Sequence, residues 1–376
     1  MWTSSEARCG IASYTASLVQ ELGVLGVEVD LVGVPYTDRD PARRRADLDR
    51  LNAADLIHLQ HEYTFFGGIA PGASSLPTWL RGLHRPHVVT AHTVFTAREL
   101  LRVDLETRPR QRLAKRILAA LPQFRRSVER TPFAGASAWI VHTEAARERF
   151  RRQQFPAERI HVLPAGIPPV AEAGGGAAEV EALRRRLGWG PGRVVAIFGY
   201  ITPDKGYELA LEAVGALPTP VHLLIAGGTR VEHERAYLDQ LEARIAASKL
   251  AARTAITGYL TDPEVRTAME LADLVLVPHT AANGSYSVMV ALGHGRPVLA
   301  ADLACFREIQ ERTGSLDLFQ AGDARSLQDR LAFLLASAGT RRQLAEKARA
   351  FAEEQSWASV AKQTAGIYRE WIGSGK

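Results

Sequence analysis

The 376-residue sequence has few cysteines and no long apolar segment. Its two cysteines, Cys9 and Cys305, lie far apart and have no metal-ligand spacing, so neither a disulfide framework nor a cysteine-based metal site is expected. No apolar run reaches the roughly 18 residues that span a bilayer. Polar residues follow Met1 and Trp2 directly, so we expect no signal peptide. These features predict a cytoplasmic protein.

Three chemical signatures are also missing. No G-x-G-x-x-G motif follows an apolar strand, which argues against a dehydrogenase. No carboxylate pair of the kind that glycosidases use can be recognised. Histidine and carboxylate side chains do not follow each other at the spacing of metal ligands. We therefore expect neither a bound metal nor a resident cofactor.

Positive charge is concentrated in the first half of the chain. The formal net charge is +5, and residues 1–172 contain 23 Lys and Arg against 18 Asp and Glu, whereas the remainder contains 23 of each. The densest basic run is Arg98–Arg130. Without a recognised motif this run does not indicate nucleic-acid binding. It could contact anionic lipid as a peripheral membrane surface, or form a solvated face.

One stretch, Asn283–Pro297, organises the second half. An apolar strand (Leu274–Pro278) precedes it and another (Val298–Ala301) follows it, which predicts a strand–loop–helix–strand unit of a parallel sheet. Ser285 or Ser287 can cap the helix. Backbone N–H groups and the helix dipole make such a loop a site for an anion, although an ordinary βαβ connection has the same pattern.

The first half predicts an α/β domain over residues 1–170. A glycine loop at Gly10 leads into a helix over Ala12–Leu25. Four short apolar strands follow, near Leu56–Leu59, Val88–Ala91, Ala138–Val141 and Ile160–Leu163. Only two residues precede the polar segment before Gly10, so the first strand is either truncated or begins upstream.

Three histidines fall at the ends of these predicted strands. His61, His92 and His142 each lie at or just past a strand's carboxyl end. Ligands of open α/β sheets bind at that edge. A single histidine there is usually a structural hydrogen-bonding residue, but three at one edge favour a binding site.

A second α/β domain is predicted over residues 171–355. The segment Ile167–Ala182 is rich in Pro, Gly and Ala and reads as a linker. A strand (Arg193–Tyr200) and a helix (Tyr207–Leu217) then open the domain. Lys205 lies between them, near a helix amino end, where a cation is unfavourable unless an anion binds beside it. A solvated surface lysine is the alternative.

Several segments resemble a known family. Those similar to the donor domain of family 4 retaining glycosyltransferases are FGYITPDKGYELAL, ITGYLTDPEVRTAMELADLVLVPH and SYSVMVALGHGRPVLAAD. Those similar to the acceptor domain of a bacterial, QHEY-containing subgroup are RCGIASYTASL, LIHLQHEYTFFGG, VVTAHTVF and IHVLPAGI. SWASVAKQTAGIYREW, within residues 356–376, resembles the closing helix that crosses back to the first domain. The resemblance implies an α/β protein of the GT-B fold, with two Rossmann-like parallel-sheet domains facing across a cleft.

The resemblance also implies site residues. His92 would lie near the reacting sugar, and Glu62 of the QHEY segment is a second catalytic candidate, with a structural ion pair as the alternative. Donor binding is implied for Gly10 and Lys205 at the diphosphate, for Gly258 and Tyr259 around the base, and for the loop residues Asn283, Gly284, Ser285, Tyr286 and Ser287. No metal is implied.

Three positions depart from the family pattern. Tyr200 stands where an arginine is usual, and Ala282 and Val290 stand where two glutamates are usual. Asn283 and Ser285 could take over sugar recognition. These departures leave the donor open and make weak or absent activity an alternative.

The implied function is transfer of a sugar from a nucleotide-diphosphate sugar, as co-substrate, to an acceptor hydroxyl with retention. A non-catalytic relative that binds a nucleotide or a partner protein, and a nucleotide-sugar epimerase, remain alternatives. The acceptor is unknown and could be anionic or lipid-linked, in which case the protein would work at the inner face of the membrane.

Overall fold

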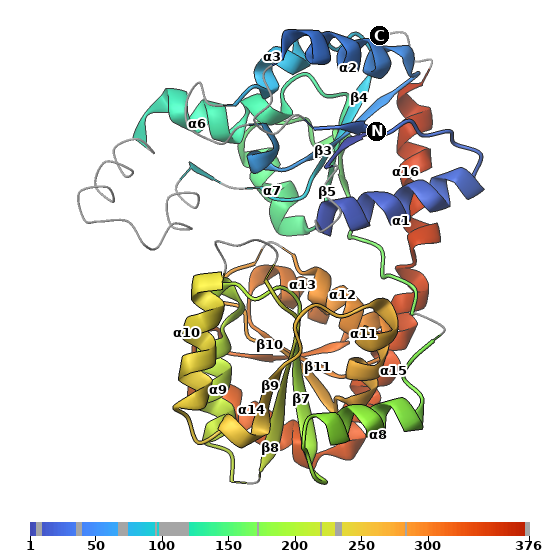
Figure 1. The fold of residues 1–376 in the computed structure, drawn as a ribbon. Coiled ribbons are helices and arrows are strands. Elements are labelled where there is room, and N and C mark those ends of the chain that lie inside the picture. Colours follow the sequence, from blue (N-terminus) through green and yellow to red (C-terminus); the bar gives the residue numbers. More distant parts are fainter. Residues whose placement is uncertain are drawn as a thin grey trace. The chain divides into compact units, whose positions relative to one another are not determined.

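The computed structural model describes residues 1–4, 10–34, 40–66, 74–94, 96–97, 120–170, 173–218, 220–229, 235–282 and 284–372. The chain divides into two compact units (Figure 1). Unit 1 consists of Met1–Ala165 together with Trp357–Lys376, and unit 2 of Gly166–Ser356. Each is described by itself.

Unit 1 contains a six-stranded parallel sheet with the order β2-β1-β3-β4-β5-β6. Its strands are β1 (Trp2–Thr3), β2 (Val32–Gly33), β3 (Ile57–His61), β4 (His87–Ala91), β5 (Ala138–Val141) and β6 (Ile160–Val162). The four strands predicted after the first helix are all present, with ends shifted by at most two residues. β1 has only two residues, yet Trp2 pairs with Val32 on one side and with Leu59 on the other.

Both ends of the chain contribute helices to unit 1. The helices are α1 (Gly10–Val24), α2 (Pro41–Ala53), α3 (Leu76–Leu80), α6 (Pro122–Glu129), α7 (Glu144–Arg152) and α16 (Trp357–Trp371), with 3-10 turns at Tyr63–Phe66, Thr131–Phe133 and Ala157–Arg159. The last helix, α16, lies beside α1 (Figure 1). They share an apolar cluster that includes Tyr14, Leu18, Trp357 and Val360.

Unit 2 has a second six-stranded parallel sheet, with the order β12-β11-β10-β7-β8-β9. Its strands are β7 (Arg193–Phe198), β8 (Val221–Ala226), β9 (Thr254–Ile256), β10 (Leu274–Val277), β11 (Val298–Ala301) and β12 (Leu316–Phe319). In chain order, β8 and β9 are added on one side of β7, and β10, β11 and β12 are added on its other side. The strand order therefore reverses between β7 and β10.

The helices of unit 2 are α8 (Ala177–Arg186), α9 (Tyr207–Gly215), α10 (Arg235–Ala246), α11 (Asp262–Leu271), α12 (Tyr286–Gly293), α13 (Ala304–Thr313), α14 (Ala324–Ala336) and α15 (Ala338–Glu354), with 3-10 turns η4 (Pro203–Lys205) and η6 (Ala251–Arg253). The sequence predicted one helical segment where α14 and α15 lie. Ser337 separates them, because its backbone (φ −96°, ψ 84°) is not helical.

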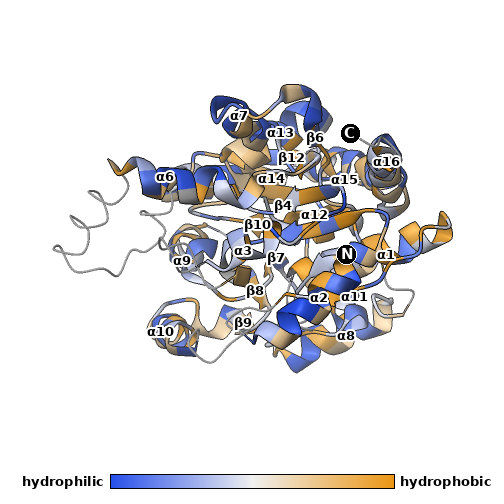
Figure 2. Cartoon of the chain, turned by 90° about the horizontal axis from the view of Figure 1, so that it is seen from above, coloured by the Kyte–Doolittle hydropathy of each residue, from blue (hydrophilic) through white to orange (hydrophobic). Residues whose placement is uncertain are grey.

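Apolar residues gather along the strands of both sheets, whereas α2 is largely hydrophilic (Figure 2). The strand residues Val88, Val89, Val275 and Leu276 have no exposed surface. Sheets covered by helices on both faces give this pattern, and the two units are Rossmann-like, as expected from the sequence. No described helix combines the length and the apolar character that a bilayer-spanning segment needs.

Candidate functional site

In unit 2, the loops after β7 and β10 meet where the strand order reverses. Ligands of doubly wound sheets bind at this switch point, outside the carboxyl ends of the strands. The loop after β7 carries Lys205, and the loop after β10 leads into α12. The topology therefore brings together two segments that the sequence marked separately.

The lysine turn η4 is clamped by the end of β10. Gly206, which follows Lys205, has φ +71°, and a Cβ atom there would lie 2.0 Å from the carbonyl oxygen of Pro278. Two residues after Pro278, the backbone N–H of Thr280 donates to the carbonyl oxygen of Asp204 at 2.9 Å. Glycine is needed because a side chain would be strained by φ and would collide with backbone. The position of Lys205 is thus set by main-chain contacts.

His279 lies between these two clamp residues and contacts the lysine itself. Nζ of Lys205 lies 2.9 Å from Nε2 of His279, and Oγ of Ser285 lies 3.3 Å from the same nitrogen. Burial, and then the charge of Lys205, lower the pKa of His279 to about 3. The ring is therefore neutral at pH 7 and accepts from the ammonium group. Sequence reasoning missed His279, although it follows a buried strand as the other three histidines do.

Ser287 and Lys205 face the same small space beside Gly199. Gly199 has φ +121°, and a Cβ atom there would lie 2.6 Å from Oγ of Ser287 and 4.0 Å from Nζ of Lys205. Ser287 lies in the first turn of α12, whose N-cap residue is Ser285. Ser285 forms no side-chain capping bond, although the sequence suggested one. Its hydroxyl contacts His279 instead. The space is bordered by a cation, a hydroxyl and a helix amino end, which suits an anion.

Glycines also bring the loops after β7, β8 and β9 together. A Cβ atom at Gly227 would lie 1.9 Å from the carbonyl oxygen of Gly199, and one at Gly228 would lie 3.1 Å from the backbone nitrogen of Tyr259. Gly258 has φ +74°, and the next residue, Tyr259, is 62 % exposed. The predicted base-framing residues therefore lie at the same edge as the lysine turn.

Tyr286, at the start of α12, is also exposed at this edge. Burial of its hydroxyl group raises the pKa of Tyr286, and the neighbouring Asp262, Tyr200 and Tyr259 raise it further. Gly284 lies in the same loop, and a Cβ atom there would meet nothing within 4 Å. Asn283, predicted to bind the donor, lies outside the described residues.

The two positions where the family resemblance implies glutamates are apolar in their surroundings as well as in their side chains. Val290 is 5 % exposed and belongs to an apolar cluster with Val288, Met289 and Phe306. Ala282 packs against the same cluster, and its carbonyl accepts from Sγ of the buried Cys305 at 3.5 Å.

In unit 1, the three predicted histidines lie at the carboxyl ends of β3, β4 and β5. The rings of His92 and His142 contact each other, whereas the ring of His61 packs against Tyr63 and Phe133. Nδ1 of His92 lies 3.2 Å from Nε2 of His142. The ring of Tyr14 stands edge-on to His92 at a centroid distance of 4.8 Å. Burial lowers the pKa of His142 and, to about 3, that of His61. Burial and the neighbouring histidines hold the pKa of His92 well below its usual range.

Glu62 follows β3 and is held by hydrogen bonds. Its Oε2 accepts from Oγ1 of Thr93 at 2.6 Å, and its Oε1 accepts from the backbone N–H of Tyr63 at 2.8 Å. Burial raises the pKa of this carboxyl group, and the two bonds partly offset that rise. Gly10 is the first residue of α1 and is exposed, whereas the loop before it, residues 5–9, lies outside the described residues.

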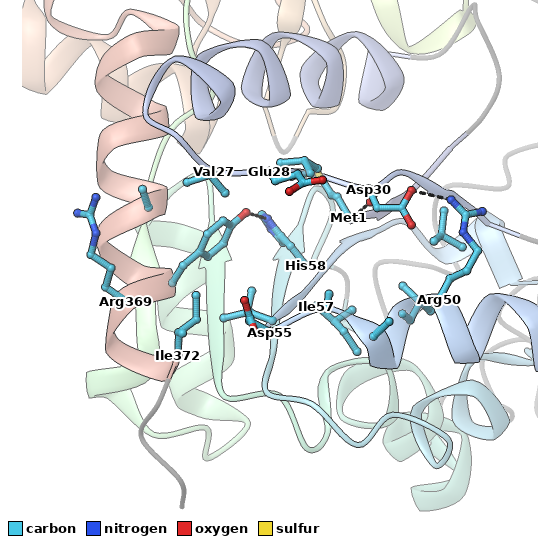
Figure 3. A pocket seen from close by; sticks show the side chains of 18 of the residues that line it. Met1, Val27, Glu28, Asp30, Arg50, Asp55, Ile57, His58, Arg369 and Ile372 are labelled. Atoms are coloured by element: carbon cyan, nitrogen blue, oxygen red, sulfur yellow. Dashed lines mark hydrogen bonds and ion pairs between the residues drawn. The ribbon is translucent and has the colours of Figure 1, made fainter.

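A cavity of about 710 Å³ lies at the opposite edge of the same sheet, near the amino ends of the strands (Figure 3). Met1, Ile57 and His58 line it, and Asp30 and Arg50 form an ion pair of 2.6 Å at its rim. Because it is at the wrong edge of the strands, we do not assign it to the candidate site. In the described ranges, no three His, Cys, Asp or Glu side chains are grouped as metal ligands.

Two family models match consecutive parts of the chain. Residues 40–170 match Glycosyltransferase Family 4, and residues 179–351 match Glycosyl transferases group 1. The basic run of the first half falls within the first match; its residues 98–119 lie outside the described part.

The curated relatives include, by name, a sugar-phosphate synthase and a kanosaminyltransferase. The chain is 28 % identical to alpha-maltose-1-phosphate synthase of Mycobacterium tuberculosis, over 86 % of this chain and 82 % of the relative. It is 27 % identical to alpha-D-kanosaminyltransferase of Streptomyces kanamyceticus, over 64 % of this chain and 62 % of the relative. The structure of Anabaena Alr3699/HepE in complex with UDP-glucose superposes with a TM-score of 0.74 at 18 % identity, covering 98 % of both chains. The fold is GT-B.

Proposed function

We propose that this chain, a family 4-like glycosyltransferase of the GT-B fold, moves a sugar from a nucleotide-diphosphate sugar to an acceptor hydroxyl with retention of configuration. Unit 2 would hold the nucleotide sugar, and unit 1 the acceptor. The relatives' names, among them alpha-maltose-1-phosphate synthase and alpha-D-kanosaminyltransferase, support sugar transfer as the chemistry.

The observation that carries the proposal is the convergence of Lys205, Ser287 and the amino end of α12 on the space beside Gly199. Departure of a nucleoside diphosphate leaves negative charge on its outer phosphate. An ammonium group and preorganised donors stabilise that charge without rearranging during the reaction. Lys205 supplies the positive charge, so the proposal needs no metal ion. Tyr259 and Tyr286 offer exposed rings to the nucleotide base.

Retention follows if the acceptor attacks from the face that the diphosphate leaves. The bond between the anomeric carbon and the phosphate oxygen breaks, the acceptor oxygen bonds to the same carbon, and the hydroxyl proton passes to the departing phosphate. No glycosyl-enzyme forms. The apolar surroundings of Val290 and Ala282 support a pathway without a carboxylate nucleophile at these positions.

We infer an anionic acceptor. Three further relatives have names containing a phosphorylated or phospholipid compound: D-inositol 3-phosphate glycosyltransferase, mannosylfructose-phosphate synthase and phosphatidyl-myo-inositol mannosyltransferase. The excess of basic residues in the first half of the chain would attract such an acceptor. A lipid-linked acceptor would also use Arg98–Arg130 as a peripheral contact to the inner face of the membrane, with the enzyme cytoplasmic.

One observation favours a second candidate. Val290 would leave the ribose hydroxyls without the carboxylate that the family pattern places there. A protein that binds a nucleotide but does not turn over a nucleotide sugar could have the same arrangement of residues at this edge of the unit 2 sheet. Binding and turnover must therefore be measured separately.

The test incubates the protein with a panel of UDP-, GDP-, ADP- and dTDP-sugars and with phosphorylated and neutral sugar acceptors. Two quantities are measured: the release of free nucleotide and the anomeric configuration of the product. We expect turnover with one nucleotide and an α-linked product from an α-linked donor. Lys205→Ala should lower kcat roughly 100-fold or more, whereas Lys249→Ala, an exposed lysine of the same unit, should not. Nucleotide binding without turnover for any acceptor would instead favour the second candidate.

A further inference from the structure

Leu163 fixes the proton positions at one end of a row of buried polar side chains in unit 1. Its carbonyl oxygen lies 2.9 Å from Nδ1 of His142. A carbonyl only accepts, so Nδ1 carries the proton. Because burial lowers the pKa of His142, the ring is neutral at pH 7 and its Nε2 has a lone pair. Nδ1 of His92, 3.2 Å away, must therefore donate to it.

The second nitrogen of His92 is then an acceptor. The ring is neutral, because burial and the surrounding histidines lower its pKa, and its single proton is already on Nδ1. Nε2 lies 2.8 Å from Oε1 of Gln60, which cannot donate. A half-turn of the Gln60 amide exchanges its oxygen and nitrogen and places a donor opposite the lone pair. The alternative is a buried imidazolium at His92.

The turned amide also fits its other neighbour. The amide nitrogen of Gln60 lies 3.3 Å from Nε2 of His58, and after the turn the oxygen faces that nitrogen. The N–H at Nε2 of His58 then donates to Oγ1 of Thr90 at 2.7 Å and has the amide oxygen as a second, more distant acceptor. Nδ1 of His58 accepts from the hydroxyl of Tyr368 at 2.5 Å. The turn gives up only a 3.5 Å contact with the sulfur of Met1, a weak acceptor.

We propose that Gln60 is a positioning residue that holds His92 as a neutral imidazole with its proton on Nδ1. This rests on the proposed function and on the place near the reacting sugar that the family resemblance implies for His92. Both ring nitrogens of His92 are then bonded, to His142 and to Gln60, and the edge-on contact with Tyr14 fixes the ring plane. His92 shapes the sugar site and transfers no proton. A neutral His92 with both nitrogens bonded is compatible with transfer of the acceptor's proton to the departing phosphate, as in the proposed function.

The row joins parts of the chain that are far apart in sequence. Tyr368 belongs to α16 and is 310 residues from His58. Yet the direction of the bonds is set at the Leu163 end, where the acceptor is a backbone carbonyl. Removing the Tyr368 hydroxyl should therefore leave the proton on Nδ1 of His92, while changing Gln60 should not.

The experiment is a long-range ¹H–¹⁵N correlation spectrum of the full chain labelled with [¹⁵N]histidine, at pH 7, which distinguishes the two neutral tautomers from the imidazolium. Signals are assigned with His92→Gln, His142→Gln and His58→Gln. We expect His92 and His142 with the proton on Nδ1, and His58 with the proton on Nε2. A proton on Nε2 of His92, or on both nitrogens, would overturn the proposal.

Gln60→Glu supplies the second measurement. A carboxylate cannot donate, so Nε2 of His92 must take up a proton, and the neutral Nδ1–H signal should be lost and replaced by that of an imidazolium. Gln363→Glu, the same change at an exposed position of α16, should leave the His92 signal in place, as should Tyr368→Phe. An unchanged His92 signal in folded Gln60→Glu would contradict the proposal if the introduced carboxyl group is ionised, which its side-chain ¹³C shift reports, because a protonated carboxyl donates as the amide does. If Gln60→Glu does not fold, the wild-type spectrum decides. None of these spectra depends on turnover, so failure here leaves the Lys205 test intact.

Discussion

Lys205 donates its ammonium protons towards His279, whose Nε2 lies 2.9 Å from Nζ. The histidine is 2 % exposed and stays neutral, because its pKa is lowered to about 3. It therefore fixes the lysine in place without cancelling its charge. A carboxylate in the same position would hold the lysine equally well but would neutralise the group that a pyrophosphate needs.

This difference can be tested with a matched pair of variants at His279. His279→Gln keeps a neutral acceptor, so its Kd for a nucleoside diphosphate should stay within about threefold of the original value. His279→Asp adds a negative charge beside Lys205 and should raise the Kd by about tenfold or more, since one opposing interaction of this kind is worth roughly 1–3 kcal/mol. Titration calorimetry measures both. Equal affinities of the two folded variants would show that the charge of Lys205 does not contribute to binding.

Gly206→Ala should disrupt the lysine turn. The new methyl group would lie 2.0 Å from the Pro278 carbonyl oxygen and on a residue with φ +71°, so we expect a loss of at least about 2 kcal/mol in the free energy of unfolding. Gly339→Ala, in α15, meets nothing within 4 Å and should be neutral or slightly stabilising. Urea unfolding followed by circular dichroism compares them. A tolerated Gly206→Ala would mean that η4 moves freely relative to β10.

Acid should destabilise unit 1 through His61. Its pKa is about 3 in the folded protein, against an ordinary value of 6.5, because the ring is buried. Between these values the unfolded chain binds more protons, so the free energy of unfolding falls as pH decreases from 6.5, by roughly 1.4 kcal/mol per pH unit for this group. His61→Phe removes the titrating ring and keeps an aromatic side chain beside Tyr63 and Phe133.

We therefore expect His61→Phe to match the original protein at pH 7.5 and to exceed its stability by about 2 kcal/mol at pH 5. Nδ1 of His61 has no hydrogen-bond partner among the described residues, so little is lost at pH 7.5. Urea unfolding followed by tryptophan fluorescence reports mainly on unit 1, which holds five of the six tryptophans. His84→Gln, at an exposed position, is the control. Parallel pH profiles for all three proteins would rule out the role assigned to His61.

Most strands could be predicted because they are short apolar runs between turn residues, as in β4, β7 and β10. The helix α2 was not predicted. Its sequence, Pro41–Ala53, has only one buried residue, Leu51, so it has almost no apolar periodicity, and its N-cap Asp40 was the available signal. Strand β12 and helix α13 were also not predicted. β12 has only four residues with Asp317 among them, and α13 has only two buried residues, Cys305 and Phe306.

The sequence could predict those site residues whose location follows from their position relative to the strands and helices. Lys205 and Ser287 could be placed at strand and helix ends from the order of elements. His279 could not be distinguished from a structural histidine, since its importance lies in a contact with a residue 74 positions away. The role of Gln60 depends on the acceptor at Leu163, which sequence patterns do not encode. Asn283 and most of Arg98–Arg130 lie outside the described residues, so their predicted roles stay predictions.

The interleaving of the two units has a consequence for synthesis on the ribosome. Unit 2 is one continuous segment and can complete its core once α15 has emerged. Unit 1 cannot, because α16 covers Tyr14 and Leu18 of α1 and contributes Tyr368 to the buried row. The domain made first is therefore finished last, and the nascent chain exposes an apolar helix face for nearly the whole of its translation. A chaperone that binds early would have its target on α1.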